Sequence, residues 1–152
     1  MKLWIARHGE ADAAGSDDLR ALTRNGSEAI GELARAAAAR GWRPAIIRHS
    51  GKKRALETAR ILQKQTGGSL VAEPLKLLLP ESDPEALLRW IDEQNQDLLL
   101  VSHLPLVAGI AEALEAGLPG GRFAPGTILA FERGNGRWLN TGRLASDELQ
   151  RD

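Results

Sequence analysis

Arg7 and His8 stand side by side where an apolar run of the sequence stops. The run, Leu-Trp-Ile-Ala at residues 3–6, predicts a buried strand, and Gly9 follows the pair. Polar groups near a protein interior are costly unless they find partners, so this pair needs a ligand or a partner. A guanidinium can bind two oxygens of an oxyanion at once, and an imidazole can act as a nucleophile near neutral pH. The pair therefore indicates anion chemistry at a strand end.

Polar residues also follow two further apolar runs of the chain. Residues 45–47 precede the segment that ends in Arg54, and residues 98–101 precede His103. In an open parallel sheet the carboxyl ends of the strands share one edge, and ligands usually bind there. We therefore expect two arginines and two histidines to converge on one site.

Short apolar runs alternate with stretches of helical period, which is typical of an α/β fold. Thr23 is expected to cap a helix that stops at Gly41, and Asp83 and Pro84 are expected to begin another. Asn135-Gly136 predicts a hairpin. The sequence predicts a three-layer domain over residues 1–152, with a mostly parallel central sheet flanked by helices. The expected strands are residues 3–6, 45–47, 70–72, 98–101, 127–132 and 137–141.

The composition excludes several classes of protein and partner. Lys plus Arg and Asp plus Glu both number 20, so the net charge of zero argues against nucleic-acid and anionic-membrane partners. The absence of cysteine excludes disulfides and thiolate chemistry. No apolar run approaches the ~18 to 20 residues of a membrane span, and the first run is too short for a signal peptide. A cytoplasmic protein is expected, with its oligomeric state left open.

Three segments in a fixed order resemble the histidine phosphatase superfamily, the phosphoglycerate-mutase-like fold. They are "ARHGE" at residues 6–10, "SGKKRALETA" at 50–59 and "VSHLPLV" at 101–107, and "LTRNG" lies between the first two. The small SixA-type phosphohistidine phosphatases are particularly similar. The resemblance implies this fold without a large inserted helical lid, and phosphatase activity without metal or organic cofactor.

Residue by residue, the resemblance implies that His8 is a nucleophile that forms a phosphohistidine intermediate. Arg7 and Arg54 would hold the phosphoryl oxygens, and His103 would complete the cluster. Phosphoryl transfer spreads charge over three equatorial oxygens, so fixed positive donors and an in-line nucleophile suit it. His8 must attack with a neutral nitrogen, which requires an acceptor for its other nitrogen, and nearby arginines should lower its pKa.

Three neighbouring residues are expected to bind the substrate. Gly9 should let the backbone approach the phosphate, because it has no side chain. Glu10 should orient the arginines or a histidine. The amide of Leu104, near the start of a helix, should point at the anion.

The general acid stays open. Larger relatives carry a glutamate in an inserted helical region that this chain lacks, which leaves Glu10, Asp12, Glu81 and Asp83 as candidates. A missing acid matters most for an alkoxide leaving group and less for an imidazole. This favours phosphohistidine on a signalling or phosphotransfer protein as the substrate.

Three alternatives accompany this hypothesis. The first is a phosphatase of small phosphate esters, and the second is a non-catalytic module that binds a phosphorylated protein. The third is a zinc hydrolase built on the three histidines, which Arg7 beside His8 and the absence of HxH or HExxH spacing oppose. His49 is interpreted as a loop residue near the site, and Lys52 as part of a solvated basic rim.

Overall fold

The computed structural model describes residues 1–115 and 123–149, and a six-stranded sheet lies at their centre. The strands lie in the order β3-β2-β4-β1-β5-β6. The first four strands along the chain pair in parallel, while β5 and β6 pair in the antiparallel sense. The mostly parallel sheet is therefore confirmed. The strands are β1 (Lys2–Arg7), β2 (Ile46–His49), β3 (Glu73–Pro74), β4 (Leu98–Ser102), β5 (Thr127–Gly134) and β6 (Arg137–Ala145).

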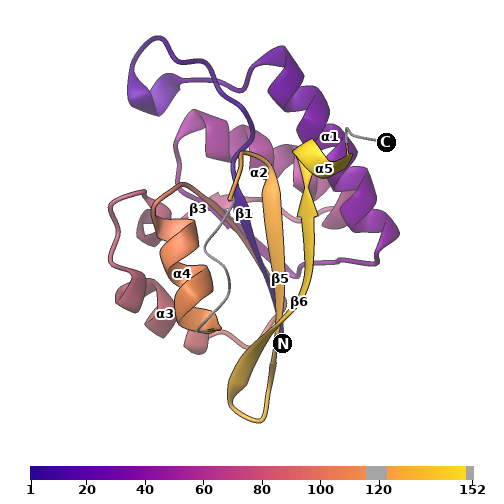
Figure 1. Ribbon diagram of the computed structural model, residues 1–152, viewed down its shortest axis with the longest axis vertical. Coiled ribbons are helices and arrows are strands. Elements are labelled where there is room, and N and C mark those ends of the chain that lie inside the picture. The colour runs from indigo at the N-terminus through magenta and orange to yellow at the C-terminus, as the bar shows by residue number, and fades with distance from the viewer. Residues whose placement is uncertain (116–122, 150–152) are drawn as a thin grey trace.

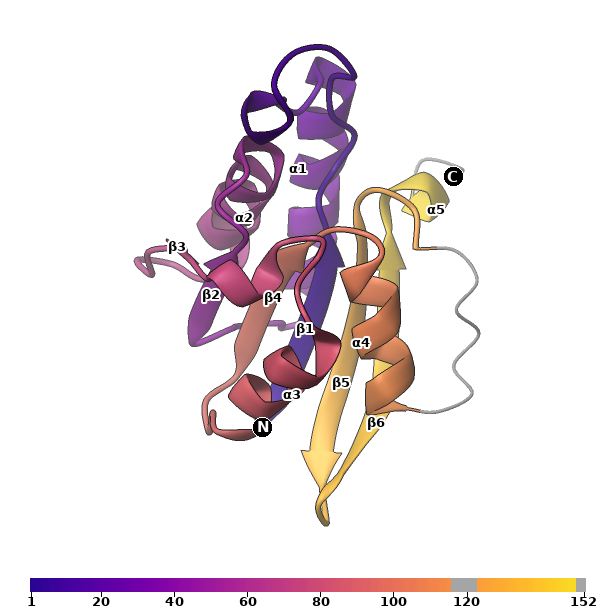
Figure 2. The same cartoon turned by 90° about the vertical axis from the view of Figure 1, so that its left-hand side faces the viewer.

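Helices cover both faces of the sheet, which gives three layers (Figures 1 and 2). One face carries α1 (Arg24–Ala39), α2 (Lys53–Thr66) and the short α5 (Ser146–Leu149), and the other carries α3 (Pro84–Asp92) and α4 (Leu106–Leu114). Two short 3-10 helices, Asp17–Leu19 and Lys76–Leu78, lie in loops. Only the second of these stands between β3 and α3, so this connection holds no large inserted lid.

Strand β1 is buried on both faces, which explains its continuous apolar sequence. Trp4 and Ala6 pack with residues of α1 and α2, whereas Leu3 and Ile5 pack with residues of α3 and α4. In the register, Arg7 lies beside Ser102 at the end of β4. The carboxyl ends of β1 and β4 are thus level, and the sheet presents their next residues at one edge.

The helix boundaries follow the capping signals of the sequence. The Thr23 hydroxyl accepts a hydrogen bond from the Gly26 amide at 2.9 Å, and α1 ends just before Gly41, whose φ is +77°. At α3 the carboxylate of Asp83 accepts from the Glu85 amide at 3.1 Å. The Thr23 and Asp83 side chains supply hydrogen-bond acceptors to backbone amides at the start of their helices. Gly41 supplies the left-handed backbone conformation that often ends a helix.

The third strand is not where the sequence indicates it. Strand β3 occupies residues 73–74 and pairs with the end of β2, whereas the expected 70–72 segment is not in the sheet. The side chain of Val71 is 73% exposed, so the apolar residues of this segment do not form a buried strand. A strand of two residues has no periodicity that a sequence pattern can show.

The carboxy-terminal hairpin is confirmed and is longer than expected. Asn135 and Gly136 have φ values of 54° and 74°, as a tight two-residue hairpin turn requires. Strand β6 continues to Ala145, and the buried Leu144 belongs to it. Among the helices of residues 1–115 and 123–149, none is long and apolar enough to cross a membrane.

Candidate active site

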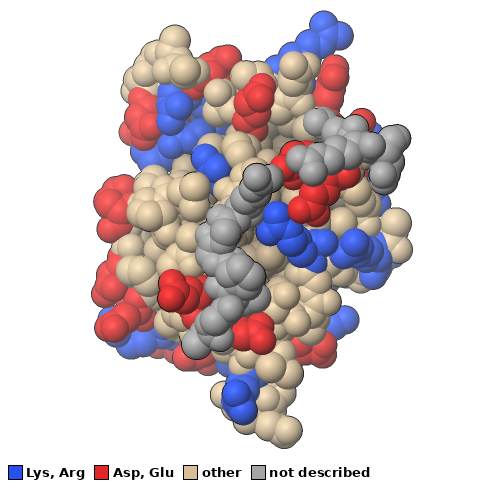
Figure 3. Space-filling model, viewed as in Figure 1, with Lys and Arg blue, Asp and Glu red and all other residues tan. Residues whose placement is uncertain are grey.

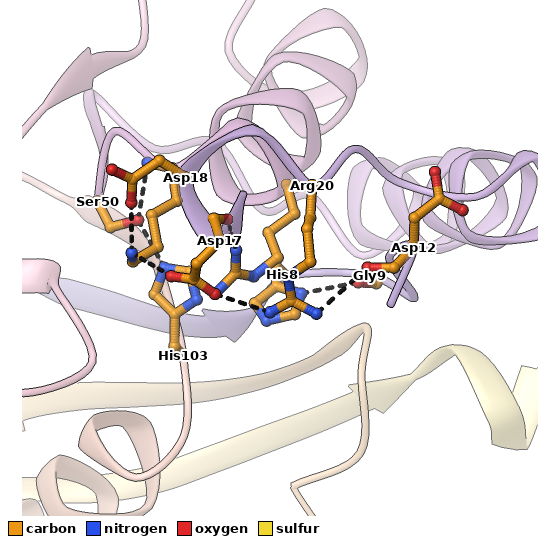
Figure 4. Close-up of polar contacts among 10 residues, drawn as sticks. His8, Gly9, Asp12, Asp17, Asp18, Arg20, Ser50 and His103 are labelled. Carbon is orange, nitrogen blue, oxygen red and sulfur yellow. Dashed lines mark hydrogen bonds and ion pairs between the residues drawn. The ribbon is translucent and has the colours of Figure 1, made fainter. Parts of the chain in front are cut away.

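A cavity of about 560 Å³ lies at the carboxyl edge of the sheet, where β1 and β4 end. The two arginines and two histidines that the sequence predicts to converge line it together, and Figure 4 shows His8 and His103 among them. Their convergence follows from the parallel register, which brings residues far apart in sequence to one edge. The lining includes Arg7, His8, Arg54 and His103, together with Gly9, Glu10, Glu81 and Leu104.

The imidazole of His8 is held in one orientation by its own neighbour. Its Nδ1 lies 2.7 Å from the carbonyl oxygen of Gly9. A carbonyl oxygen only accepts, so Nδ1 carries the proton in the neutral ring and Nε2 carries the lone pair. The expected acceptor for the second nitrogen is therefore the Gly9 carbonyl, and Nε2 is the atom available for attack.

The pKa of His8 is lowered from 6.5 to about 4. Burial is the largest cause, because it disfavours the charged ring, and the positive charges of Arg54, Arg7 and Arg20 add repulsion. The hydrogen bond to the Gly9 carbonyl acts in the opposite direction. His8 is consequently neutral near pH 7, as a nucleophile must be, although burial contributes more than the arginines.

His103 lies beside His8, with the ring centroids 4.9 Å apart. Its Nε2 is 2.6 Å from the hydroxyl of Ser50, which follows β2 directly. Its pKa is lowered to about 3, first by burial and then by the charge of His8. His103 therefore offers the site a neutral ring near pH 7 and adds no positive charge.

The two arginines are anchored by carbonyl oxygens of the chain. Arg7 Nη1 donates to the Phe123 carbonyl at 2.9 Å, and Arg54 Nη1 donates to the Asp17 carbonyl at 2.7 Å. Burial, with some repulsion between charges, lowers the pKa of both guanidiniums. Among the described residues, three buried nitrogens of the cluster have no hydrogen-bond partner: Arg7 Nε, Arg54 Nε and His103 Nδ1.

The structure gives Gly9 a role that differs from the expected one. A Cβ at this position would lie 2.7 Å from Cγ1 of Ile30, which is fully buried on α1. The Gly9 amide donates to the Thr58 hydroxyl at 3.1 Å. Glycine is therefore required here by the close approach of α1, on the core side of the backbone.

Within the described residues, the Glu10 carboxylate contacts the start of α1, and its expected role in orienting the arginines or a histidine stays a prediction. Its carboxylate accepts from the Thr23 hydroxyl at 2.7 Å and ties the loop to the start of α1. Of the four candidates for the general acid, Glu10 and Glu81 line the cavity. Asp12 and Asp83 are not in that lining, and the carboxylate of Asp83 caps α3.

Sequence reasoning missed three residues of this site, namely Ser50, Asp17 and Arg20, and it placed Lys52 on a solvated rim. Ser50 contacts His103, while Asp17, Arg20 and Lys52 form part of the cavity wall. Lys52 is not a solvated rim residue, because its side chain is 11% exposed and contacts Asp17 and Asp18. Ser50 follows a strand at the same sheet edge, so the rule that found His103 would have found it too. Asp17 and Arg20 lie in a loop that carries no such signal.

His49 is a strand residue, contrary to its interpretation as a loop histidine. It is buried at the end of β2, and its Nδ1 accepts a hydrogen bond from the Gly51 amide at 3.0 Å. It is not among the residues that line the cavity. Within the part of the chain that the structure describes, no three His, Asp or Glu side chains are grouped to hold a metal ion. The arrangement therefore offers no ligand set for the zinc alternative.

A family model connects this cavity with known proteins. The model of the histidine phosphatase superfamily (branch 1) matches residues 3–76, which include β1, the Arg54 segment and the loop between them. A search of curated proteins finds no significant match. The matched region includes His8, Arg7 and Arg54, whereas His103 lies outside it.

Solved structures extend the likeness to the whole fold. The protein histidine phosphatase SixA, complexed with tungstate, is 25% identical, with a TM-score of 0.89 and coverage of 98% of this chain and 99% of that one. A protein from Agrobacterium tumefaciens that is also named SixA is 24% identical, with a TM-score of 0.83 and coverage of 95% and 97%. A phosphoserine phosphatase from Entamoeba histolytica, complexed with phosphoserine, is 18% identical, with a TM-score of 0.74 and coverage of 97% and 98%.

These findings confirm the resemblance to the histidine phosphatase superfamily. The chain has the phosphoglycerate-mutase-like fold along almost its whole length and matches the superfamily's sequence model over residues 3–76. Phosphatase activity is the chemistry that this likeness supports.

Proposed function

We propose that this protein hydrolyses phosphohistidine in a signalling or phosphotransfer protein through a covalent intermediate on His8. One observation carries the proposal. The neutral imidazole of His8, whose Nε2 carries the lone pair, lines the same cavity as Arg7, Arg54 and His103, and each of these three residues has a buried nitrogen without a hydrogen-bond partner. A bound phosphoryl group has the oxygens that could satisfy such donors. Two guanidiniums supply the positive charge that phosphoryl transfer needs.

In the first step Nε2 of His8 attacks phosphorus, and the bond between phosphorus and the leaving nitrogen or oxygen breaks. Arg7 and Arg54 stabilise the charge on the three equatorial oxygens. A phosphohistidine leaves as neutral imidazole with the proton that its other ring nitrogen already carries, whereas an alkoxide would take a proton from an acid such as Glu81. In the second step water attacks the phosphorus of phospho-His8. Orthophosphate leaves, and the neutral imidazole with its proton on Nδ1 is regenerated.

The substrate preference rests on the leaving group. An imidazole nitrogen can be protonated before the bond breaks, so it needs less help from an acid than an alkoxide does. Glu81 lines the cavity, and its side chain is exposed to solvent. The similarity to SixA favours the same substrate, and we expect a phosphotransfer protein of the cytoplasm as the partner.

Hydrolysis of small phosphate esters is the second candidate. It is favoured by the position of Glu81 in the cavity wall, where a carboxylic acid could protonate an alkoxide. The fold is also that of the phosphoserine phosphatase described above. A phosphohistidine protein, phosphoserine and an aryl phosphate, compared by kcat/KM on one preparation, distinguish the two candidates.

Trapping the intermediate tests the chemistry. The protein is mixed with a ³²P-labelled phosphohistidine protein and quenched in alkali, which preserves phosphohistidine. Label on the wild-type chain and none on a folded His8→Ala variant is the expected result. Undiminished turnover by the His8→Ala variant would remove the nucleophile assignment. Binding of the phosphoprotein without label or turnover would instead identify a non-catalytic binding module.

A further inference from the structure

The loop between β1 and α1 places the carboxylate of Asp17 among three cations in the cavity wall (Figure 4). Its Oδ1 accepts hydrogen bonds from Arg20 Nη2 at 3.0 Å and from Arg54 Nη2 at 3.2 Å. Its Oδ2 accepts a hydrogen bond from Lys52 Nζ. All four residues line the same cavity as His8.

The three cations and the carboxylate differ in how they are held. The side chains of Arg54, Lys52 and Arg20 are 5%, 11% and 27% exposed, whereas that of Asp17 is 56% exposed. Lys52 is the N-cap residue of α2, and Arg54 lies in the first turn of this helix, which packs on the sheet. Lys52 and Arg54 are therefore built into the wall at the start of α2, whereas Asp17 is supplied by the loop between β1 and α1, which also carries Arg20. Figure 3 shows basic and acidic side chains next to each other where this loop lies.

The charges of this group require an anion at the position of Asp17. Without that carboxylate, three positive side chains would lie close together, and Asp18, 2.7 Å from Lys52, would be their nearest described counter-ion. The pKa of Lys52 is raised, chiefly by its hydrogen bond to Asp17. The pKa of Asp17 is lowered, first by Lys52 and then by Arg20, so it stays ionised. A carboxylate presents two oxygens to such donors, as one edge of a phosphate does.

We propose that Arg20, Lys52 and Arg54 form a second oxyanion-binding position in the catalytic cavity. Asp17 fills this position in the free protein and yields it to a second acidic group of the substrate, a carboxylate or a phosphate. The proposal rests on the proposed function, because the first position, beside His8, takes the phosphoryl group. It narrows the substrates to those with an acidic group close to the phosphoryl group, such as an acidic side chain next to phosphohistidine.

Two small probes test the second position. Phosphoglycolate carries a phosphoryl group and a carboxylate, whereas ethyl phosphate is of similar size and lacks the carboxylate. Binding of both is measured by calorimetry on the His8→Ala variant, which cannot turn them over, with and without Asp17→Asn. We expect Asp17→Asn to increase the preference for phosphoglycolate over ethyl phosphate on the order of 10-fold, the value of a charge-assisted hydrogen bond.

Matched variants make the result specific. Glu28→Gln removes a charge from the nearby start of α1, where Glu28 pairs with Arg24 outside the cavity lining, and should leave the preference unchanged. Lys52→Gln, added to Asp17→Asn, should abolish the gain. If Asp17→Asn strengthens the binding of both probes equally, the proposal is overturned, because Asp17 would then cover the phosphoryl position itself. An unchanged preference for phosphoglycolate over ethyl phosphate would overturn it too. If no variant binds either probe, the proposed function fails along with it, whereas binding of ethyl phosphate with a flat preference removes only the second position.

Discussion

Replacing Ser50 by alanine tests how the proton of His103 is placed. The Ser50 hydroxyl oxygen accepts a hydrogen bond from the Lys52 amide at 3.3 Å, and among the described residues His103 Nε2 is the acceptor within reach of its own proton. We therefore expect Ser50 to donate to Nε2, which places the imidazole proton of neutral His103 on Nδ1. Nδ1 is one of the three unpartnered nitrogens, so its N–H becomes a donor for the phosphoryl group.

The expected magnitude follows from the burial of both residues. Ser50 and His103 are almost fully buried, so Ser50→Ala leaves Nε2 without a donor and away from water. An unsatisfied buried group costs about 1–3 kcal/mol, part of which is relieved if the proton moves to Nε2. Loss of the Nδ1 donor from the transition state would then slow phosphorylation of His8 by roughly 5- to 150-fold.

The assay reads the proton position directly. Long-range ¹H–¹⁵N correlation spectra distinguish a protonated from an unprotonated ring nitrogen. The wild-type protein should show His103 protonated on Nδ1, and Ser50→Ala should shift the population toward Nε2 while kcat falls. Ser50→Thr keeps the hydroxyl and should restore both readings. Ser82→Ala removes a hydroxyl that donates to the Lys76 carbonyl and should change neither.

Two outcomes would refute this reasoning. The first is a wild-type His103 with its proton on Nε2, which would make Ser50 the acceptor. The second is a folded Ser50→Ala protein with the wild-type proton position and rate. A loss of rate with an unchanged ring would assign Ser50 a packing role only.

Two further predictions concern stability. Above pH 6.5 His8 and His103 are neutral in both the folded and the unfolded state. As the pH falls toward 4, both histidines become protonated in the unfolded chain but stay neutral in the folded protein, because their folded pKa values are about 4 and 3. Urea unfolding should show stability falling by up to about 1.4 kcal/mol per pH unit for each histidine, and a flat midpoint from pH 7 to 5 would contradict this. Gly9→Ala should cost about 1–3 kcal/mol, because its Cβ meets Ile30. In a double-mutant cycle Ile30→Ala should make that cost smaller, and strict additivity would exclude the contact.

The catalytic cluster could be predicted because it depends on sheet topology. Arg7, His8 and His103 each follow a buried apolar strand, and parallel strands bring their carboxyl ends to one edge. Arg54 comes five residues after the end of β2, in the first turn of α2. Neither inference needs side-chain detail, since the register of the backbone alone determines which residues meet.

Other features depend on contacts that no local pattern reports. The position of Asp17 follows from hydrogen bonds between a loop and α2, 37 residues away. Position 9 requires glycine because the side chain of Ile30 packs against it, and the sequence "RHG" contains no sign of this contact. Strand β3 has two residues and is determined by its pairing with β2. In each case the decisive partner is distant in sequence.

The level ends of β1 and β4 have a consequence for synthesis on the ribosome. The growing chain receives the residues of the cavity in three stages, at positions 7–8, 54 and 103, and His103 is added 95 residues after His8. Until then the nascent chain holds His8 without the other residues that surround it in the folded protein. In a cell-free translation reaction, phosphatase activity should consequently appear only after the segment that contains His103 has been made and folded. The time at which activity appears would then report when the sheet has formed.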